Sequence, residues 1–122
     1  MNLNQVTLPS RDIAESVEFY QHMGFDLIVH SPHYARFKSA GDATFSVHAS
    51  KLCNAGETVI YFECDSLDEQ VAMLQGRGIV FAQLPRDESW LWREARLFDP
   101  SGNQLCLYHA GVNRLDPPWR IR

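Results

Sequence analysis

Residues 12–25 read DIAESVEFYQHMGF, a stretch that contains a complete helix signal and the start of a strand. Asp12 can accept hydrogen bonds from the first backbone N–H groups of a helix, and Gly24 can adopt the left-handed conformation that often ends one. Between them, apolar side chains recur at helical spacing: Ile13, Val17 and Tyr20, with Phe19 and Met23 beside them. The stretch therefore predicts an amphipathic helix followed by a strand at Phe25–His30.

Short runs of β-forming residues surround this helix. One strand is predicted before it, at residues 3–8, and two more are predicted after the strand at 25–30, at residues 34–38 and 44–48. The first half of the chain is therefore expected to have the order βαβββ.

The same order of elements is predicted again in the second half. Strands are expected at residues 59–64, 79–83, 95–98 and 104–108, and a helix is expected directly after Ser66. The second half therefore also has the predicted order βαβββ.

The two halves correspond at a fixed offset of 54, which aligns Val6 with Ile60 and Gly24 with Gly78. At the last strand the offset becomes about 60, so a longer loop is expected near Pro85–Trp92. Because each half alone is too small to bury its sheet, this internal repeat predicts two modules in one fold.

Length and composition are those of one globular domain, with 122 residues of which 45% are hydrophobic and 21% charged. We expect the domain to span residues 1–112, with modules at about 3–50 and 57–110. Residues 113–122 are expected to form an extended tail, because two consecutive prolines restrict its backbone.

Charge and patterning exclude several classes of partner. Eleven Lys and Arg against fifteen Asp and Glu give a net charge of −4, which argues against non-specific nucleic-acid binding. No apolar run is long enough to span a membrane, and residues 1–5 do not resemble the start of a secretory signal. Three cysteines without a CxxC pair are typical of a reducing compartment, so a cytoplasmic protein is expected.

Four stretches occur together in a specific order, namely LNQVTL at 3–8, FYQHMGF at 19–25, YFECD at 61–65 and LFDPSGNQL at 97–105. Through them the chain resembles the vicinal-oxygen-chelate superfamily, which includes glyoxalases, bleomycin-resistance proteins and ring-cleaving dioxygenases. The resemblance implies an α+β fold of two tandem βαβββ modules whose sheets curl around a shared cavity, usually in a homodimer. It does not by itself fix the function.

Metal-dependent members of this superfamily hold a divalent ion with His or Gln on the first strand of each module and usually Glu on the last. Strand alternation places these positions at Gln5, Ser46, Val59 and Cys106. Val59 carries no donor atom, and the other three are weak, neutral or soft ligands. No metal cofactor is therefore predicted. A two-residue shift would bring in His48 and leave three poor ligands.

The same alternation identifies side chains expected to face the cavity, together with two Trp and the Arg residues near its mouth. The predicted ligand-binding residues are Gln5, Thr7, Arg36, Ser46, His48, Tyr61, Trp90, Trp92, Arg96, Cys106 and Tyr108. Glu63, His48 and Cys106 are candidate catalytic residues. Against these roles, Glu63 is equally read as a solvated strand residue, His48 as a structural histidine and Cys106 as an inert buried thiol.

The sequence therefore favours a metal-free, homodimeric protein that binds a small organic molecule, with a cationic or aromatic ligand suiting an acidic protein that has Trp near its pocket. One alternative is a metal-dependent lyase, isomerase or dioxygenase with atypical ligands. A second is a metal-free acid–base enzyme that uses Glu63, His48 or Cys106.

Overall fold

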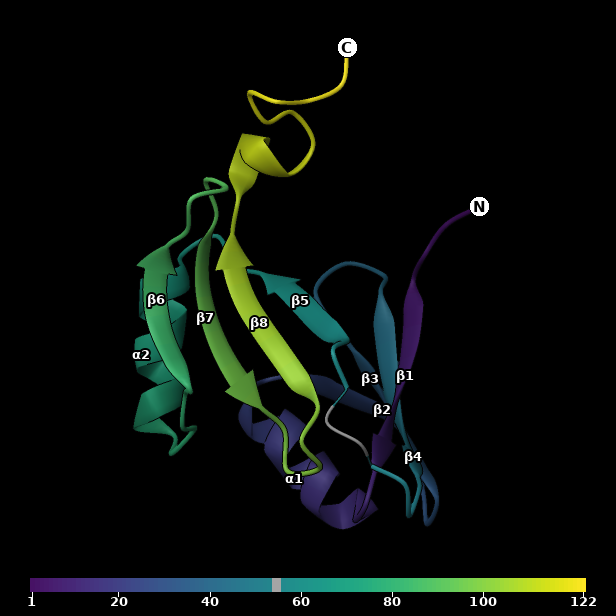
Figure 1. Cartoon of the computed structure of the whole chain (residues 1–122). Coiled ribbons are helices and arrows are strands. Elements are labelled where there is room, and N and C mark those ends of the chain that lie inside the picture. Colours follow the sequence, from purple (N-terminus) through teal and green to yellow (C-terminus); the bar gives the residue numbers. More distant parts are fainter. Residues whose placement is uncertain (54–55) are drawn as a thin grey trace. The chain divides into compact units, whose positions relative to one another are not determined.

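The computed structural model describes residues 1–53 and 56–122, which fall into two compact units. Unit one comprises Met1–Glu57 and the later turn Asp99–Asn103, and unit two comprises Thr58–Phe98 and Gln104–Arg122. Each unit has one α-helix and a four-stranded sheet (Figure 1). The predicted α+β class and the predicted tandem βαβββ order are confirmed.

Unit one is a mixed sheet with its helix against one face. Its elements are β1 (Gln5–Ser10), α1 (Ile13–His22), β2 (Asp26–Ser31), β3 (Tyr34–Lys38) and β4 (Thr44–Ala49). The strand order is β1-β4-β3-β2, with β1 and β4 parallel and the other pairs antiparallel. As predicted, Asp12 caps α1, because its Oδ1 accepts from the Glu15 N–H at 3.1 Å. Gly24 follows the helix with φ at +99°.

The core of unit one is built from aromatic rings. Phe37 and Phe45 stack with centroids 5.1 Å apart, and Tyr20 on α1 packs edge-on against Phe45 at 4.9 Å. All three are buried, as is Val47 two residues beyond Phe45. The burial of Phe45 and Val47 fits the alternation expected for β4, which turns Ser46 to the opposite face.

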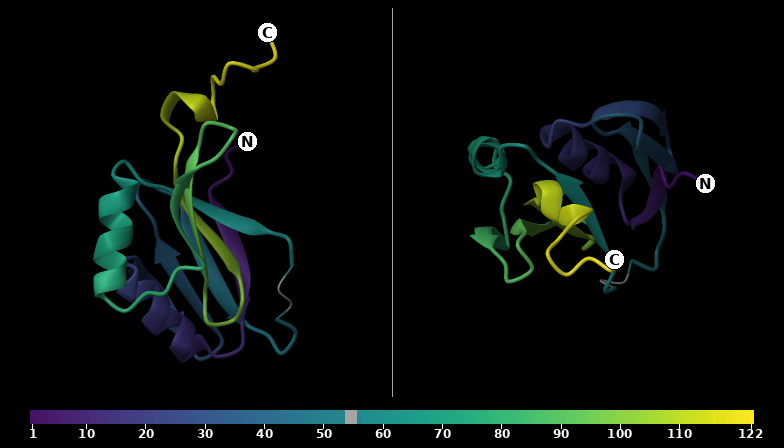
Figure 2. Two further views of the ribbon diagram at one scale, coloured as in Figure 1. Left: turned by 60° about the vertical axis from the view of Figure 1, so that its left-hand side comes forward. Right: turned by 90° about the horizontal axis from the view of Figure 1, so that it is seen from above.

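Unit two repeats this arrangement. Its elements are β5 (Val59–Glu63), α2 (Leu67–Gly76), β6 (Gln83–Asp87), β7 (Arg93–Phe98), β8 (Gln104–His109) and the short 3-10 helix η1 (Gly111–Arg114). The strand order is β5-β8-β7-β6, and α2 lies along one face of the sheet (Figure 2). Its buried side chains Leu67, Val71 and Leu74 recur at helical spacing.

Strand register confirms the internal repeat. Gln5 pairs with Thr44 across the parallel strands of unit one, and Val59 pairs with Gln104 at the same place in unit two. The first strands of the two units are therefore offset by 54 residues and the last strands by 60, as predicted by aligning the two halves of the sequence.

The edge strand of unit two differs from the prediction. A strand was expected at 79–83 and a loop at 85–92, but β6 lies at Gln83–Asp87. Proline removes a ladder donor and is tolerated on edge strands and at bulges. Pro85 meets both conditions, because β6 is an edge strand and its register shifts between Gln83 and Arg86.

The turn Asp99–Asn103 belongs to unit one and is organised by a buried carboxylate. Asp99 Oδ1 accepts from the backbone N–H groups of Ser101 and Asn103, both at 2.9 Å. Its Oδ2 accepts from the Tyr20 hydroxyl at 2.6 Å and from Asn103 Nδ2 at 2.7 Å. Asn103 Nδ2 also donates to the carbonyl of Pro9 at 2.9 Å. Two motifs far apart in the sequence, FYQHMGF and DPSGN, therefore meet at one hydrogen bond.

The C-terminal residues do not follow the extended path predicted for 113–122. Asn113 and Arg114 belong to η1, and two further turns are closed by the bonds from Asp116 N–H to Val112 O and from Arg120 N–H to Pro117 O. Across residues 1–53 and 56–122, neither helix has the length and apolar character needed to cross a bilayer.

Candidate functional site

A hydrogen-bonded polar network occupies one face of the unit-one sheet. Gln5 Nε2 donates to Ser46 Oγ at 2.8 Å, and Ser46 Oγ shares a hydrogen bond of 2.5 Å with the Tyr34 hydroxyl. Gln5 also contacts Thr7 at 3.3 Å and accepts from Thr44. The structure thus brings together the predicted residues Gln5, Thr7 and Ser46.

Arg36 brings a positive charge to this network through Tyr34, a residue that was not predicted from the sequence. Its Nε donates to the Tyr34 hydroxyl at 2.9 Å, and its guanidinium lies 5.5 Å from the centre of the Tyr34 ring. The pKa of Tyr34 is lowered, first by the hydrogen bond with Ser46 and then by Arg36, although burial opposes the shift. Tyr34 lies two residues before Arg36 on β3, so period-two alternation could have identified it.

His48 is exposed near the end of β4 and is not part of the network. It pairs with Pro9, whereas Gln5 pairs with Thr44, four residues earlier on β4. At about 3.3 Å per residue this separates His48 from Gln5 by roughly 13 Å along the strands. The strand register therefore does not bring Gln5 and His48 together, and the His48 side chain lies outside the polar network.

In unit two, the face formed by β5, β8 and β7 carries an aromatic group, Tyr61, Trp92 and Tyr108, which the sequence predicted as ligand-binding residues. Trp92 and Tyr108 stack at 4.7 Å, and Tyr61 meets both rings edge-on at 6.0 and 5.5 Å. Tyr108 is buried, whereas Tyr61 remains 44% exposed. The group therefore has a packed base and one accessible ring.

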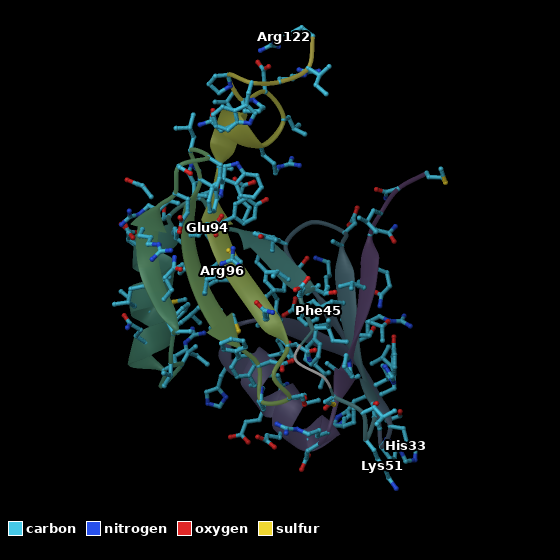
Figure 3. The ribbon with its side chains drawn as sticks, viewed as in Figure 1. His33, Phe45, Lys51, Glu94, Arg96 and Arg122 are labelled. Carbon is cyan, nitrogen blue, oxygen red and sulfur yellow. The ribbon has the colours of Figure 1, made fainter. Side chains whose placement is uncertain are left out.

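A buried carboxylate, Glu94, lies beside the aromatic group on β7 and was not predicted. Its side chain is only 2% exposed, and Arg96 Nη2 donates to it at 2.7 Å (Figure 3). The Trp90 indole N–H donates to the other oxygen at 2.7 Å. Arg96 also lies 5.5 Å from the centre of the Tyr61 ring. Glu94 thus joins the predicted residues Arg96 and Trp90 into one cluster.

The hairpin between β6 and β7 positions the two tryptophans. Glu88 N–H donates to the Trp92 carbonyl at 2.8 Å, and Leu91 takes a left-handed conformation with φ at +67°. This turn directs the Trp90 indole to Glu94, while the Trp92 indole donates to the Asn113 carbonyl at 3.3 Å. Trp92 therefore packs on Tyr108 and also contacts the start of the C-terminal segment.

Cys106 is fully buried and packs in one cluster with Tyr108 and Trp92. Burial raises the pKa of its thiol to about 12, and Glu94 adds to the shift. A nucleophilic cysteine needs the opposite, a pKa lowered toward neutrality. Cys106 therefore fits the inert buried thiol and not the catalytic nucleophile.

The raised cysteine pKa values predict a loss of stability in alkali. Burial raises the pKa of Cys106 from 9.0 to about 12 and that of Cys64 from 9.0 to about 11. Their stabilisation is complete below pH 9 and is lost as the pH rises toward these folded-state values. At pH 10.5 we expect Cys106 alone to lower the free energy of unfolding by about 2 kcal/mol.

Urea unfolding at pH 8 and pH 10.5 measures this loss. The Cys106→Ala variant is the control, because it should lose much less stability between the two pH values than the original chain. An equal loss in both proteins would contradict the assignment to Cys106.

Glu63 does not have the properties of a raised-pKa base. Its Oε2 accepts from the backbone N–H groups of Ala110 and Gly111 at 2.9 and 3.0 Å, and Arg114 lies 3.6 Å from Oε1. Burial by itself would raise the pKa of Glu63. The two backbone hydrogen bonds and the nearby Arg114 and His109 outweigh burial, so the pKa is lowered. Glu63 therefore anchors the start of η1 as a carboxylate, which corrects its candidate role as a general base.

The side chains at the four positions implied for a divalent metal are each poor or absent donors. Val59 packs with Cys106 and Tyr108 as an apolar side chain, and Cys106 holds its proton. Ser46 and Gln5 are engaged with each other, and the Arg36 cation is one hydroxyl away. Within the described part of the chain, His, Cys, Asp and Glu side chains do not form a group of three or more that could hold a metal ion.

Comparison with known proteins identifies the class. The family model described as the Glyoxalase/Bleomycin resistance protein/Dioxygenase superfamily matches residues 2–107, so the chain belongs to this superfamily. None of the curated proteins compared with the chain matches it.

Solved structures share this fold. A glyoxalase/bleomycin resistance protein/dioxygenase from Nocardioides has a TM-score of 0.81 at 22% identity, covering 100% of this chain and 90% of its own. A bleomycin resistance determinant encoded on transposon Tn5 has a TM-score of 0.76 at 22% identity, covering 89% and 98%. A bleomycin-binding protein complexed with bleomycin has a TM-score of 0.73 at 23% identity, again covering 89% and 98%.

Proposed function

We propose that this chain is a metal-free binding protein for a planar aromatic organic molecule. The observation that carries the proposal is the aromatic group of unit two, in which the accessible Tyr61 ring sits against packed Trp92 and Tyr108. Small-molecule sites combine such apolar and aromatic surface with a few fixed polar groups. The Glu94–Arg96 pair supplies these polar groups here.

The charge of the cluster favours an aromatic ligand over a simple cation. Arg96 lies near the face of Tyr61 and is neutralised by Glu94, so the aromatic group carries no unpaired negative charge. Stacking on aromatic rings is available to any planar ligand and is worth about 0.5–1.5 kcal/mol per ring pair beyond burial. The solved structure of a bleomycin-binding protein with bleomycin supports small-molecule binding on this fold.

The metal-free part of the proposal rests on the residues at the four family positions. Val59 has no donor atom, and a guanidinium beside Ser46 repels a divalent cation. Catalysis through a bound metal is therefore not proposed. Candidate catalytic roles for Glu63 and Cys106 are not proposed either, because one is a structural carboxylate and the other a protonated thiol.

Calorimetric titration with three probes tests the proposal: cationic proflavine, anionic naphthalene-2-sulfonate and metal-free bleomycin. We expect saturable binding of at least one probe and about tenfold weaker binding after Tyr61→Ala. Leu84→Ala is the matched control, because Leu84 is similarly exposed on β6 at 54%. Failure of all three probes to bind, or equal binding by Tyr61→Ala, contradicts the proposal.

Metal content tests the second half of the proposal. Mass spectrometry of untagged protein purified without added metal should find far less than one divalent ion per chain. Thermal melts with nickel, cobalt, manganese, zinc and ferrous iron should not shift, because a ligand at a hundred times its Kd would stabilise by about 2.7 kcal/mol. About one ion per chain would overturn the metal-free assignment.

We also propose that the protein is cytoplasmic and that it forms a homodimer, the latter because the superfamily resemblance implies one. All three cysteines are unpaired, which suits a reducing compartment. Ile28 and Val29 lie exposed on the edge strand β2 and offer apolar surface to a second copy. Light scattering should give twice the chain mass, and a monomer at micromolar concentration would contradict this.

A further inference from the structure

The polar network of unit one has more hydrogen-bond donors than acceptors. Tyr34 and Ser46 each have one hydroxyl proton, and only one of these protons can lie in the 2.5 Å bond between them. Tyr34 already accepts from Arg36 Nε, and Ser46 already accepts from Gln5 Nε2. Whichever hydroxyl donates to the other, the remaining proton has no acceptor among the side chains that the structure describes.

Arg36 adds to this excess of donors. Its Nε is used by Tyr34, but its two terminal amino groups bond to no acceptor in residues 1–53 and 56–122, and it is not ion-paired with any carboxylate there. Its side chain is half-buried beside the buried Ser46, which it opposes across β3 and β4. A guanidinium in this position is partly removed from water and retains unused donors.

We propose that Arg36, Tyr34 and Ser46 form a binding site for a small oxyanion, such as the carboxylate of an organic molecule. The unused Arg36 amino groups would donate to the anion, and the surplus hydroxyl proton of the Tyr34–Ser46 pair would donate alongside them. Hydrogen bonds from a charged donor to an oxyanion are the stronger class in proteins. The lowered pKa of Tyr34 fits these surroundings, because they stabilise negative charge.

This site uses only unit-one residues and does not rest on the proposed aromatic ligand. The Glu94–Arg96 cluster of unit two differs, because the Arg96 charge is already paired with the Glu94 carboxylate. The network also accounts for the neutral residues at two of the family metal positions. Gln5 and Ser46 orient Tyr34 and Arg36 toward an anion and offer no charge to a cation.

NMR titration of the backbone amides with acetate tests the proposal, with chloride keeping the ionic strength constant. Acetate has no ring, so it separates this site from the aromatic group of unit two. We expect saturable shifts centred on Gln5, Tyr34 and Ser46. Arg36→Gln should weaken the binding by about tenfold, and Tyr34→Phe should weaken it by about threefold.

Lys51→Gln is the matched control. It removes one positive charge from unit one at an exposed position whose side chain takes no part in the described hydrogen bonds of the network. It should leave acetate binding within about twofold of the original chain.

Inorganic sulfate, titrated separately, distinguishes the kind of anion. Tighter binding of acetate than of sulfate identifies a carboxylate site, and tighter binding of sulfate identifies a tetrahedral oxyanion, and either supports the site if Arg36→Gln weakens it. Absence of saturable shifts with both anions, or equal binding by Arg36→Gln, overturns the proposal.

Discussion

Arg96→Leu is expected to lower the free energy of unfolding by about 3–5 kcal/mol, because it leaves the Glu94 carboxylate buried without its cation. Glu94 is almost fully buried, and its remaining partners would be two uncharged groups, the Trp90 indole N–H and the Cys106 thiol. Removing one member of a buried pair costs more than the pair itself contributes, since an uncompensated charge remains.

The double variant Glu94→Leu with Arg96→Leu separates this cause from lost packing. Both charges are then absent, so we expect it to recover most of the stability that Arg96→Leu loses. Urea unfolding of the three proteins measures the difference. Equal losses in the single and double variants would show that packing, and not the unpaired carboxylate, is responsible.

Asp99→Ala is expected to destabilise the protein by about 3–5 kcal/mol, comparable to Arg96→Leu. The substitution removes four hydrogen bonds to a buried carboxylate, and a hydrogen bond to a charged group contributes about 1.5–3 kcal/mol. The total loss is smaller than the sum of the four, because the released donors can form hydrogen bonds with water instead. Those donors are two backbone N–H groups, the Tyr20 hydroxyl and Asn103 Nδ2.

Tyr20→Phe should cause a smaller loss of stability than Asp99→Ala, because it removes one of the four donors and keeps the ring in the aromatic core. We expect it to cost about 1–3 kcal/mol. Asp42→Ala, at an exposed turn in unit one, is the matched control and should change the stability by less than about 0.5 kcal/mol. Thermal and urea unfolding of all three variants give the ranking, and a loss for Asp42→Ala equal to that for Asp99→Ala would contradict the account.

The fold could be predicted because its signals are local and repeated. Helical spacing after Asp12 and Ser66, and alternation in the last strands, fixed the βαβββ order in both halves. The offset of 54 then held in the register of the parallel strands. β6 was misplaced because the change of offset to about 60 was taken to mean a loop near Pro85–Trp92, although an edge strand tolerates a proline. β1 also begins and ends two residues later than the strand expected at 3–8.

The sequence predicted those parts of the candidate site that depend on a single strand or loop. Tyr61 and Tyr108 follow from alternation and Trp92 from the expected loop near Pro85–Trp92, and the structure brings the three rings together. Glu94 was missed because the expected strand began at Ala95, one residue too late to place it on the inner face. The role of Glu63 depends on backbone N–H groups of Ala110 and Gly111, which are 47 and 48 residues away and which alternation cannot supply.

The hydrogen bond between Tyr20 and Asp99 closes a loop of 79 residues. Contacts of such long sequence separation form slowly, since the ordering of the intervening chain opposes them. The turn that completes unit one is made in the second half of the chain, so a fragment ending at Glu57 would bury the Tyr20 hydroxyl without this acceptor. The two halves repeat the same strand order, but the first cannot reach its finished state before the second has been synthesised.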